Sequence, residues 1–166
     1  ALADEAVVDL CANAAEADRA FALARDRFSR RGQFSTLGEA YAAARQASPE
    51  APSVQVYERY REILDGKSVD LTVTAEAVAV RPTDVNARFN HALALLQAGQ
   101  AKEALAVFDG FDVLTPQLPP GLQAVCAALL HAAGDQSALT LAGSINPDLL
   151  WPGEYALIAP LLQAGR

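Results

Sequence analysis

Apolar residues recur at three- and four-residue steps along most of the chain, a spacing that places them on one face of a helix. Two consecutive segments show it best. The segment 85–99 carries a broad apolar surface, and the segment 101–111 places Ala101, Ala104, Leu105, Phe108 and Phe111 on one face. Gly99 can adopt the left-handed backbone that ends a helix, and Pro116 cannot continue one. The pattern predicts two antiparallel helices joined at Gly99, the second running toward Pro116.

The same arrangement repeats along the chain. Its marker glycines stand 31 to 35 residues apart and are Gly32, Gly66, Gly99, Gly134 and Gly165. Prolines keep a parallel spacing at Pro49, Pro82, Pro116 and Pro147. A period between 20 and 50 residues is typical of proteins built from repeated supersecondary units. The sequence therefore predicts a series of helical hairpins, in which each glycine marks a turn and each proline a stop.

The segment 69–80 fits this scheme least well. Apolar and polar residues alternate there, as in a strand, and six residues are β-branched. Six such residues cost a helix about 3 kcal/mol relative to alanine, whereas burial of two or three Leu or Val side chains contributes more. A lone strand among helices would also leave both of its edges unpaired. We therefore expect a helix here, irregular or shortened rather than replaced by a sheet.

The copy at 85–118 resembles the tetratricopeptide repeat, a family of 34-residue helix-turn-helix units. The matching positions are small Ala92, large apolar Leu95, the turn at Gly99, small Ala104, aromatic Phe108 and the closing Pro116. The segment 18–50 keeps most of these distances, and 51–84 and 120–150 match more loosely. Residues 1–17 and 151–166 resemble half repeats. The resemblance implies an all-α fold over 1–166, a single domain of stacked antiparallel helix hairpins that form an α–α superhelix.

In the family that the chain resembles, first helices line a concave groove that binds peptides. Carried over position by position, the groove residues would be Asp26, Arg30, Gln55, Arg59, Asn86, Phe89, Leu93, Gln97 and His131. The resemblance thus implies a noncatalytic scaffold or adaptor whose partner is a protein or a peptide. Two alternatives stay open. The repeats can serve as an accessory or sensor domain of a larger enzyme or regulatory protein, or can self-associate through ends that lack a capping repeat.

Composition narrows the possible functions. The chain has 52% hydrophobic residues and a net charge of -7, so we expect neither disorder nor nucleic-acid binding, which needs a basic face. Prolines interrupt the long uncharged stretch at 113–134, and no membrane insertion is expected. Cys11 and Cys126 lie in apolar segments and are predicted to be buried thiols. The chain starts at Ala1 and contains no methionine, which indicates a piece of a longer protein.

Residue patterns that support catalysis are absent from the sequence. It contains no paired histidines or cysteines at metal-ligand spacing, no phosphate-binding glycine loop and no nucleophile motif. We therefore expect no enzymatic activity, no metal and no cofactor. The segment 18–31 is richer in charge, with Arg19, Arg25, Arg27, Arg30 and Arg31 beside two acids. This cluster is interpreted either as a solvated helix of mixed charge or as a contact site for a carboxylate.

Overall fold

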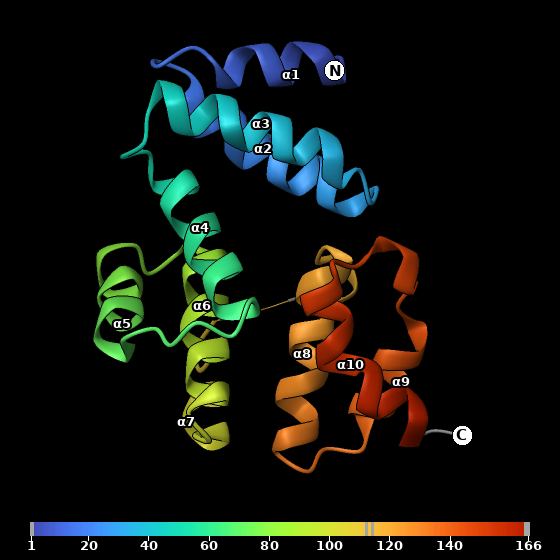
Figure 1. Cartoon of the computed structure of the whole chain (residues 1–166). Coiled ribbons are helices and arrows are strands. Elements are labelled where there is room, and N and C mark those ends of the chain that lie inside the picture. The colour runs from blue at the N-terminus through green and yellow to red at the C-terminus, as the bar shows by residue number, and fades with distance from the viewer. Residues whose placement is uncertain (1, 112, 114, 165–166) are drawn as a thin grey trace. The chain divides into compact units, whose positions relative to one another are not determined.

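The chain is all-α. A computed structural model describes residues 2–111, 113 and 115–164, and these form helices and turns without a strand (Figure 1). The segment 69–80 is confirmed as a helix that begins at Leu71, where the side chain of Asp70 accepts a hydrogen bond from the backbone N–H of Thr72 at 2.8 Å. The described residues divide into two compact units, Ala1–Arg59 and Tyr60–Arg166. The prediction of one domain stays a prediction.

The first unit contains α1 (Asp4–Cys11), α2 (Ala17–Arg30), α3 (Phe34–Ala47) and the start of α4 (Pro52–Leu64). Helices α1, α2 and α3 all pack against one another (Figure 1). Three rings join them to α4, because Phe21 lies 5.2 Å from Tyr57 and 6.0 Å from Tyr41, measured between ring centroids. Burial of aromatic side chains in such tilted contacts is a major source of core stability.

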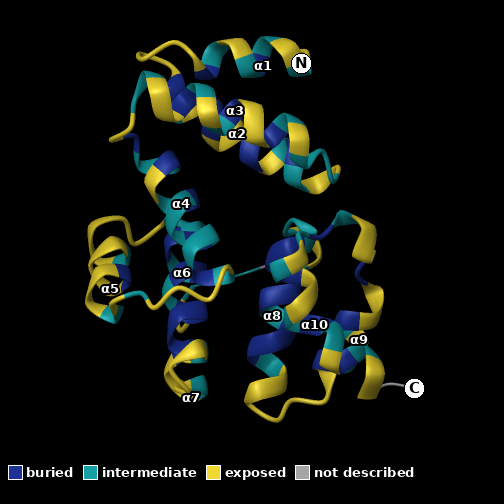
Figure 2. Ribbon diagram, in the orientation of Figure 1, coloured by how far each residue is buried: buried dark blue, intermediate teal, exposed yellow. Residues whose placement is uncertain are grey.

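The second unit contains the end of α4, then α5 (Leu71–Val80), α6 (Val85–Gln97), α7 (Ala101–Ala106), α8 (Pro120–Ala132), α9 (Ser137–Ser144) and α10 (Pro152–Ala164). Two short 3₁₀ turns, η1 (Thr115–Gln117) and η2 (Pro147–Leu149), lie between them. Helix α6 contacts α5, α7 and α8, and α8 contacts α9 and α10. The buried residues accordingly concentrate on α6 and α8 (Figure 2).

Glycines make the predicted turns. Gly32, Gly66, Gly99 and Gly134 all have a positive φ, between 66° and 81°, and each follows the first helix of a pair. A side chain at such a φ is sterically disfavoured, so glycine is the residue that permits a tight exit from the helix. Ala104 is fully buried on α7, as its small size predicts. Gly165 falls outside the described residues.

The helix predicted to run from 101 toward Pro116 is wrong in its length. Helix α7 ends at Ala106, and the chain then turns through Gly110, whose φ is +71°. Arg88 on α6 stabilises this early end. Its guanidinium donates to the carbonyl of Val107 at 2.6 Å and lies 4.5 Å from the centroid of the Phe111 ring. Phe111 therefore does not extend the apolar face of α7, and Pro116 lies within η1.

Candidate functional site

The four predicted groove residues of the first unit engage mostly with their own chain. The carboxylate of Asp26 and the Nε of Arg30 form an ion pair at 3.1 Å one helical turn apart. Gln55 donates to the carboxylate of Glu50 at 3.2 Å, and Arg59 is half-buried. An i,i+4 ion pair at the surface contributes only about 0.3–0.5 kcal/mol. Asp26 and Arg30 are both exposed. A partner's carboxylate would have to compete with Asp26 for the guanidinium of Arg30.

Other arginines of α2 are also engaged within the unit. Arg27 donates to the carbonyl of Leu2 at 2.7 Å, and Arg27 and Arg31 each lie within 3.4 Å of the carboxylate of Asp4. Arg25 is buried, with its guanidinium 5.3 Å from the ring centroid of Tyr57. These contacts favour the interpretation of mixed charge within the fold over that of a carboxylate-binding cluster.

In the second unit, two of the predicted groove residues belong to the core. Phe89 and Leu93 have no exposed surface, and the rings of Phe89 and Phe108 lie 4.9 Å apart. Neither position is exposed to solvent as a residue of the predicted groove would be, although Phe89 also borders a small apolar pocket between α6, α7 and α8. The register explains the difference, because this side of α6 packs against α7 and α8 rather than facing solvent. Asn86 is half-buried, and Gln97 and His131 are exposed.

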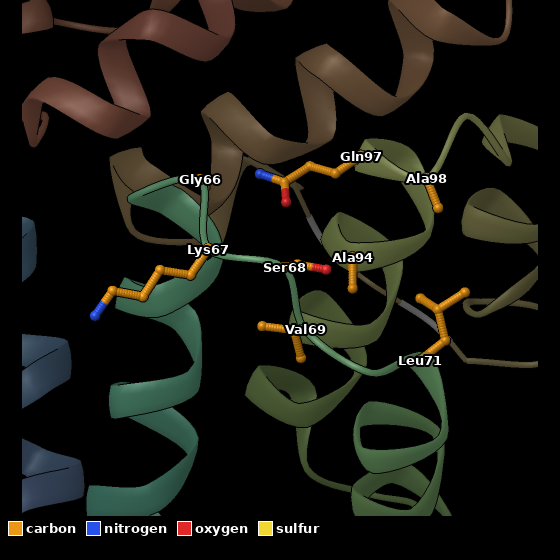
Figure 3. Close-up of a pocket in the computed structure, with 8 residues that line it drawn as sticks. All are labelled: Gly66, Lys67, Ser68, Val69, Leu71, Ala94, Gln97 and Ala98. Atoms are coloured by element: carbon orange, nitrogen blue, oxygen red, sulfur yellow. The ribbon is translucent and has the colours of Figure 1, made fainter.

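Gln97 lines a pocket of about 370 Å³. One wall is the segment that joins α4 to α5, and the other is the last turn of α6 (Figure 3). The lining residues are Gly66, Lys67, Ser68, Val69, Leu71, Ala94, Gln97 and Ala98. Figure 3 shows Gln97 reaching toward Gly66, while the side chain of Lys67 extends away from the other labelled side chains. We call this the α4–α6 pocket.

The turn at Gly66 creates this pocket. The carbonyl of Ile63 accepts hydrogen bonds from the backbone N–H of Gly66 at 3.1 Å and from the Nε2 of Gln97 at 2.7 Å. These two bonds fix the end of α4 against α6. The chain then runs in an irregular segment from Lys67 to Asp70, over the small side chains of Ala94 and Ala98. The space between the two helices remains open because alanine does not fill it.

The lining limits the chemistry that the α4–α6 pocket can support. Among the described residues that line it, only Lys67 carries a charge, and Ser68 and Gln97 supply neutral polar groups. In the same segment, the backbone N–H groups of Ser68 and Val69 donate to no other backbone group of the described chain. Across the described residues, no group of three or more His, Cys, Asp or Glu side chains could hold a metal ion.

Sequence reasoning missed the exposed face of α5. Nine of the ten residues of this helix are uncharged, yet Thr74 is its only buried residue (Figure 2). The exposed fractions are 39% for Val73 and 78% for Val80, and Ala77 lies between them on the same side. The available signal was the alternating pattern of 69–80, which contains no continuous helical stripe broad enough to be buried.

Sequence reasoning also missed a buried carboxyl group, that of Glu154. It accepts hydrogen bonds from the hydroxyl of Tyr60 at 2.5 Å and from the backbone N–H of Trp151 at 2.9 Å. The second bond is a capping contact, for which Glu three residues after the N-cap is the sequence signal. Tyr60 lies 94 residues away in the sequence, and no local pattern predicts that contact.

Burial affects the ionisable groups near these surfaces. His91 is half-buried, and its desolvation lowers the pKa of the imidazole, while its Nδ1 lies 2.8 Å from the hydroxyl of Thr74. His91 is therefore neutral near pH 7 and joins α6 to α5 through a hydrogen bond. This contact gives His91 a role in the packing of the two helices.

Comparison with protein-family models, with curated proteins and with solved structures gives no match for this chain. None of the described helices combines the length and the apolar composition that a membrane span needs.

Proposed function

We propose that this chain is a noncatalytic scaffold or adaptor module that binds a peptide or a protein segment. In this proposal its hairpins stack in the manner of the tetratricopeptide superhelix that the repeat spacing resembles. The exposed face of α5 is the observation that carries the proposal. Binding would involve this face and the α4–α6 pocket at the start of the same helix, rather than a groove lined by Phe89 and Leu93.

The face of α5 has the features of a binding surface. Val73, Ala77 and Val80 follow the four- and three-residue spacing of one helical face. Burial of apolar surface is worth about 25 cal/mol per Å², so a partner that covers Val80 would recover free energy that the isolated chain leaves unused. Single exposed apolar residues are common, whereas several on one helix indicate contact with another surface.

A library of random peptides displayed on phage tests this proposal and requires no assumption about the sequence of the partner. The library is selected on the intact chain, and enriched peptides are then measured against Val73→Glu and Val80→Glu. We expect each substitution to weaken binding at least tenfold, because it places a charge in a desolvated contact. Leu23→Glu is the matched control, since Leu23 on α2 is 40% exposed, close to the 39% of Val73.

The same peptides locate the second part of the site. Ala98→Trp adds a large side chain at an exposed position that lines the α4–α6 pocket. Loss of binding in this variant would place the peptide in the pocket as well as on α5. Selection that enriches no peptide, or peptides that bind the α5 variants and the Leu23 variant equally, would refute the proposed function.

A further inference from the structure

A second pocket lies within the second unit, between α6, α7 and α8. Its volume is about 150 Å³. Phe89 of α6, Leu105 on α7 and Phe108 just beyond α7 form one side, and Cys126, Leu129 and Leu130 of α8 form the other. Val113 and Thr115 complete the described lining. No charged side chain lines it among the described residues. We call this the α7–α8 pocket.

The early end of α7 produces this pocket. A helix continuing toward Pro116 would place further side chains against α8, but α7 ends at Ala106 and the chain turns at Gly110. Arg88 fixes that turn through its bond to the carbonyl of Val107 and its contact with Phe111. The apolar face of α8 thus meets a helix of only six residues. The pocket therefore lies where α7 is shorter than the helix that the repeat spacing predicts.

Size and lining define what this space can hold. Closely packed interiors leave few voids larger than a water molecule. Water needs two to four polar partners, whereas a dry apolar cavity of about 150 Å³ in another protein binds benzene. Among the described lining residues, Thr115 supplies one hydroxyl and Cys126 a weakly hydrogen-bonding thiol, and the remaining side chains are apolar. A charged group entering here would lose its hydration without gaining a partner.

We propose that the α7–α8 pocket is a binding site for one uncharged apolar group of about the size of benzene or toluene. The ring can belong to a free small molecule or to an aromatic side chain. This site is separate from the α5 face and the α4–α6 pocket, and it requires no peptide partner.

Cys126 provides a direct reporter of occupancy. It is partly exposed and lines the pocket, and burial raises the pKa of its thiol to about 12. Alkylation by iodoacetamide is therefore slow, and mass spectrometry can follow it at pH 9 in the intact chain. A ligand that fills the pocket blocks the thiol. The rate should fall hyperbolically with toluene concentration, roughly elevenfold at ten times the Kd.

The chain contains its own control for this measurement. Cys11 lies in the first unit, has no exposed surface and is also a free thiol. Its alkylation rate should not change with toluene, because the proposed ligand contacts only the second unit. Equal slowing of both cysteines would indicate a general effect of the solvent and would overturn the proposal.

Two further ligands test whether the pocket excludes charge and whether the bound ring is a free molecule or a side chain. Benzoate has the same ring as toluene with a negative charge, and it should protect Cys126 at least tenfold less well. N-acetylphenylalaninamide carries the ring on a peptide backbone, so protection by toluene alone identifies a free small molecule. Protection by the amide identifies a side chain, and it also supports the site. Protection by neither ring, or protection by benzoate equal to that by toluene, would overturn the proposal.

A filling substitution tests the location. Leu130→Trp enlarges a half-buried residue of the lining while Cys126 remains as reporter, and toluene should no longer slow alkylation. Leu162→Trp is the matched control, a half-buried leucine of α10 outside the pocket lining, and it should retain protection. Thr115→Phe fills the pocket from the opposite side and replaces Leu130→Trp if circular dichroism shows that this variant is unfolded. Full protection in a folded filling variant would overturn the assignment.

Discussion

The contact between Gly121 and Glu154 gives the sharpest test of the packing in the second unit. Gly121 lies in the first turn of α8, and Glu154 lies in the first turn of α10. A Cβ atom added at Gly121 would overlap Oε2 and Cδ of Glu154 and would lie 2.8 Å from its Oε1. Non-bonded atoms do not approach so closely, so Gly121→Ala forces the carboxyl group or one of the helices to move.

The size of the effect follows from the bonds of Glu154. Its side chain is buried, and moving it breaks the hydrogen bonds from Tyr60 and from the N–H of Trp151. Each such bond contributes about 1–3 kcal/mol. Alanine recovers at most about 1 kcal/mol relative to glycine through its higher helix propensity. We therefore expect Gly121→Ala to lower the free energy of unfolding by about 1–5 kcal/mol, a change opposite in sign to that from helix propensity.

Trp151 allows this loss of stability to be measured in the second unit. It is the only tryptophan, and the guanidinium of Arg61 lies 3.9 Å from its ring centroid. Its fluorescence during urea unfolding reports on the packing between α4 and α10. Gly143→Ala is the matched control, because an added Cβ at this exposed helical glycine meets no atom within 4 Å. The free energy of unfolding of that variant should rise by up to about 1 kcal/mol.

A double-mutant cycle assigns the cost to one side chain. Glu154→Ala destabilises the unit on its own, since it leaves buried donors without their acceptor. In that background, Gly121→Ala should be neutral or slightly stabilising, because the clash is gone. The reasoning fails if Gly121→Ala is harmless in the parent chain, or if its cost is unchanged when Glu154 is absent.

Three further predictions concern other parts of the structure. Phe89→Ala should cost about 3–5 kcal/mol in urea unfolding, because Phe89 is fully buried against Phe108; a loss below about 1 kcal/mol would contradict its core position. Ala104→Leu should cost about 1–3 kcal/mol by overpacking a fully buried site on α7, and a neutral result would contradict the register of α6 and α7. Burial and the hydrogen bond to Glu58 raise the pKa of Tyr41 to about 12, whereas an unfolded tyrosine titrates near 10. This contribution to stability is therefore complete below about pH 10 and declines as the pH rises toward 12, so the pH dependence of unfolding should differ between the parent and Tyr41→Phe in that window alone.

Local signals predicted the helical turns well. A left-handed turn depends on the residue at a single position, so the periodic glycines could be read directly, and four of them have the expected positive φ. The helical state of 71–80 was also predicted correctly. The reason given for it is wrong, because Thr74 is the only buried residue of α5 and none of its Leu or Val side chains is buried.

Contacts between distant segments set the features that the sequence did not predict. The end of α7 depends on Arg88, which comes 19 residues before the Val107 carbonyl that it contacts. The buried position of Phe89 depends on which side of α6 meets α7 and α8, and apolar residues on several sides of that helix left the choice open. The Tyr60–Glu154 bond joins the end of α4 to the start of α10, and neither residue differs locally from a surface polar residue.

These differences bear on where function lies in the second unit. A regular repeat fills the space between its helices, and both pockets occur where regularity is lost: beside the irregular segment after Gly66 and beside the shortened α7. Departures from local rules tend to mark functional sites, because the lost packing must be offset elsewhere in the fold. Here the offset is visible as the bonds from Gln97 to the carbonyl of Ile63 and from Arg88 to the carbonyl of Val107. Each pocket is therefore held open by a specific polar contact, and replacing Gln97 or Arg88 with alanine should alter one pocket while leaving the other intact.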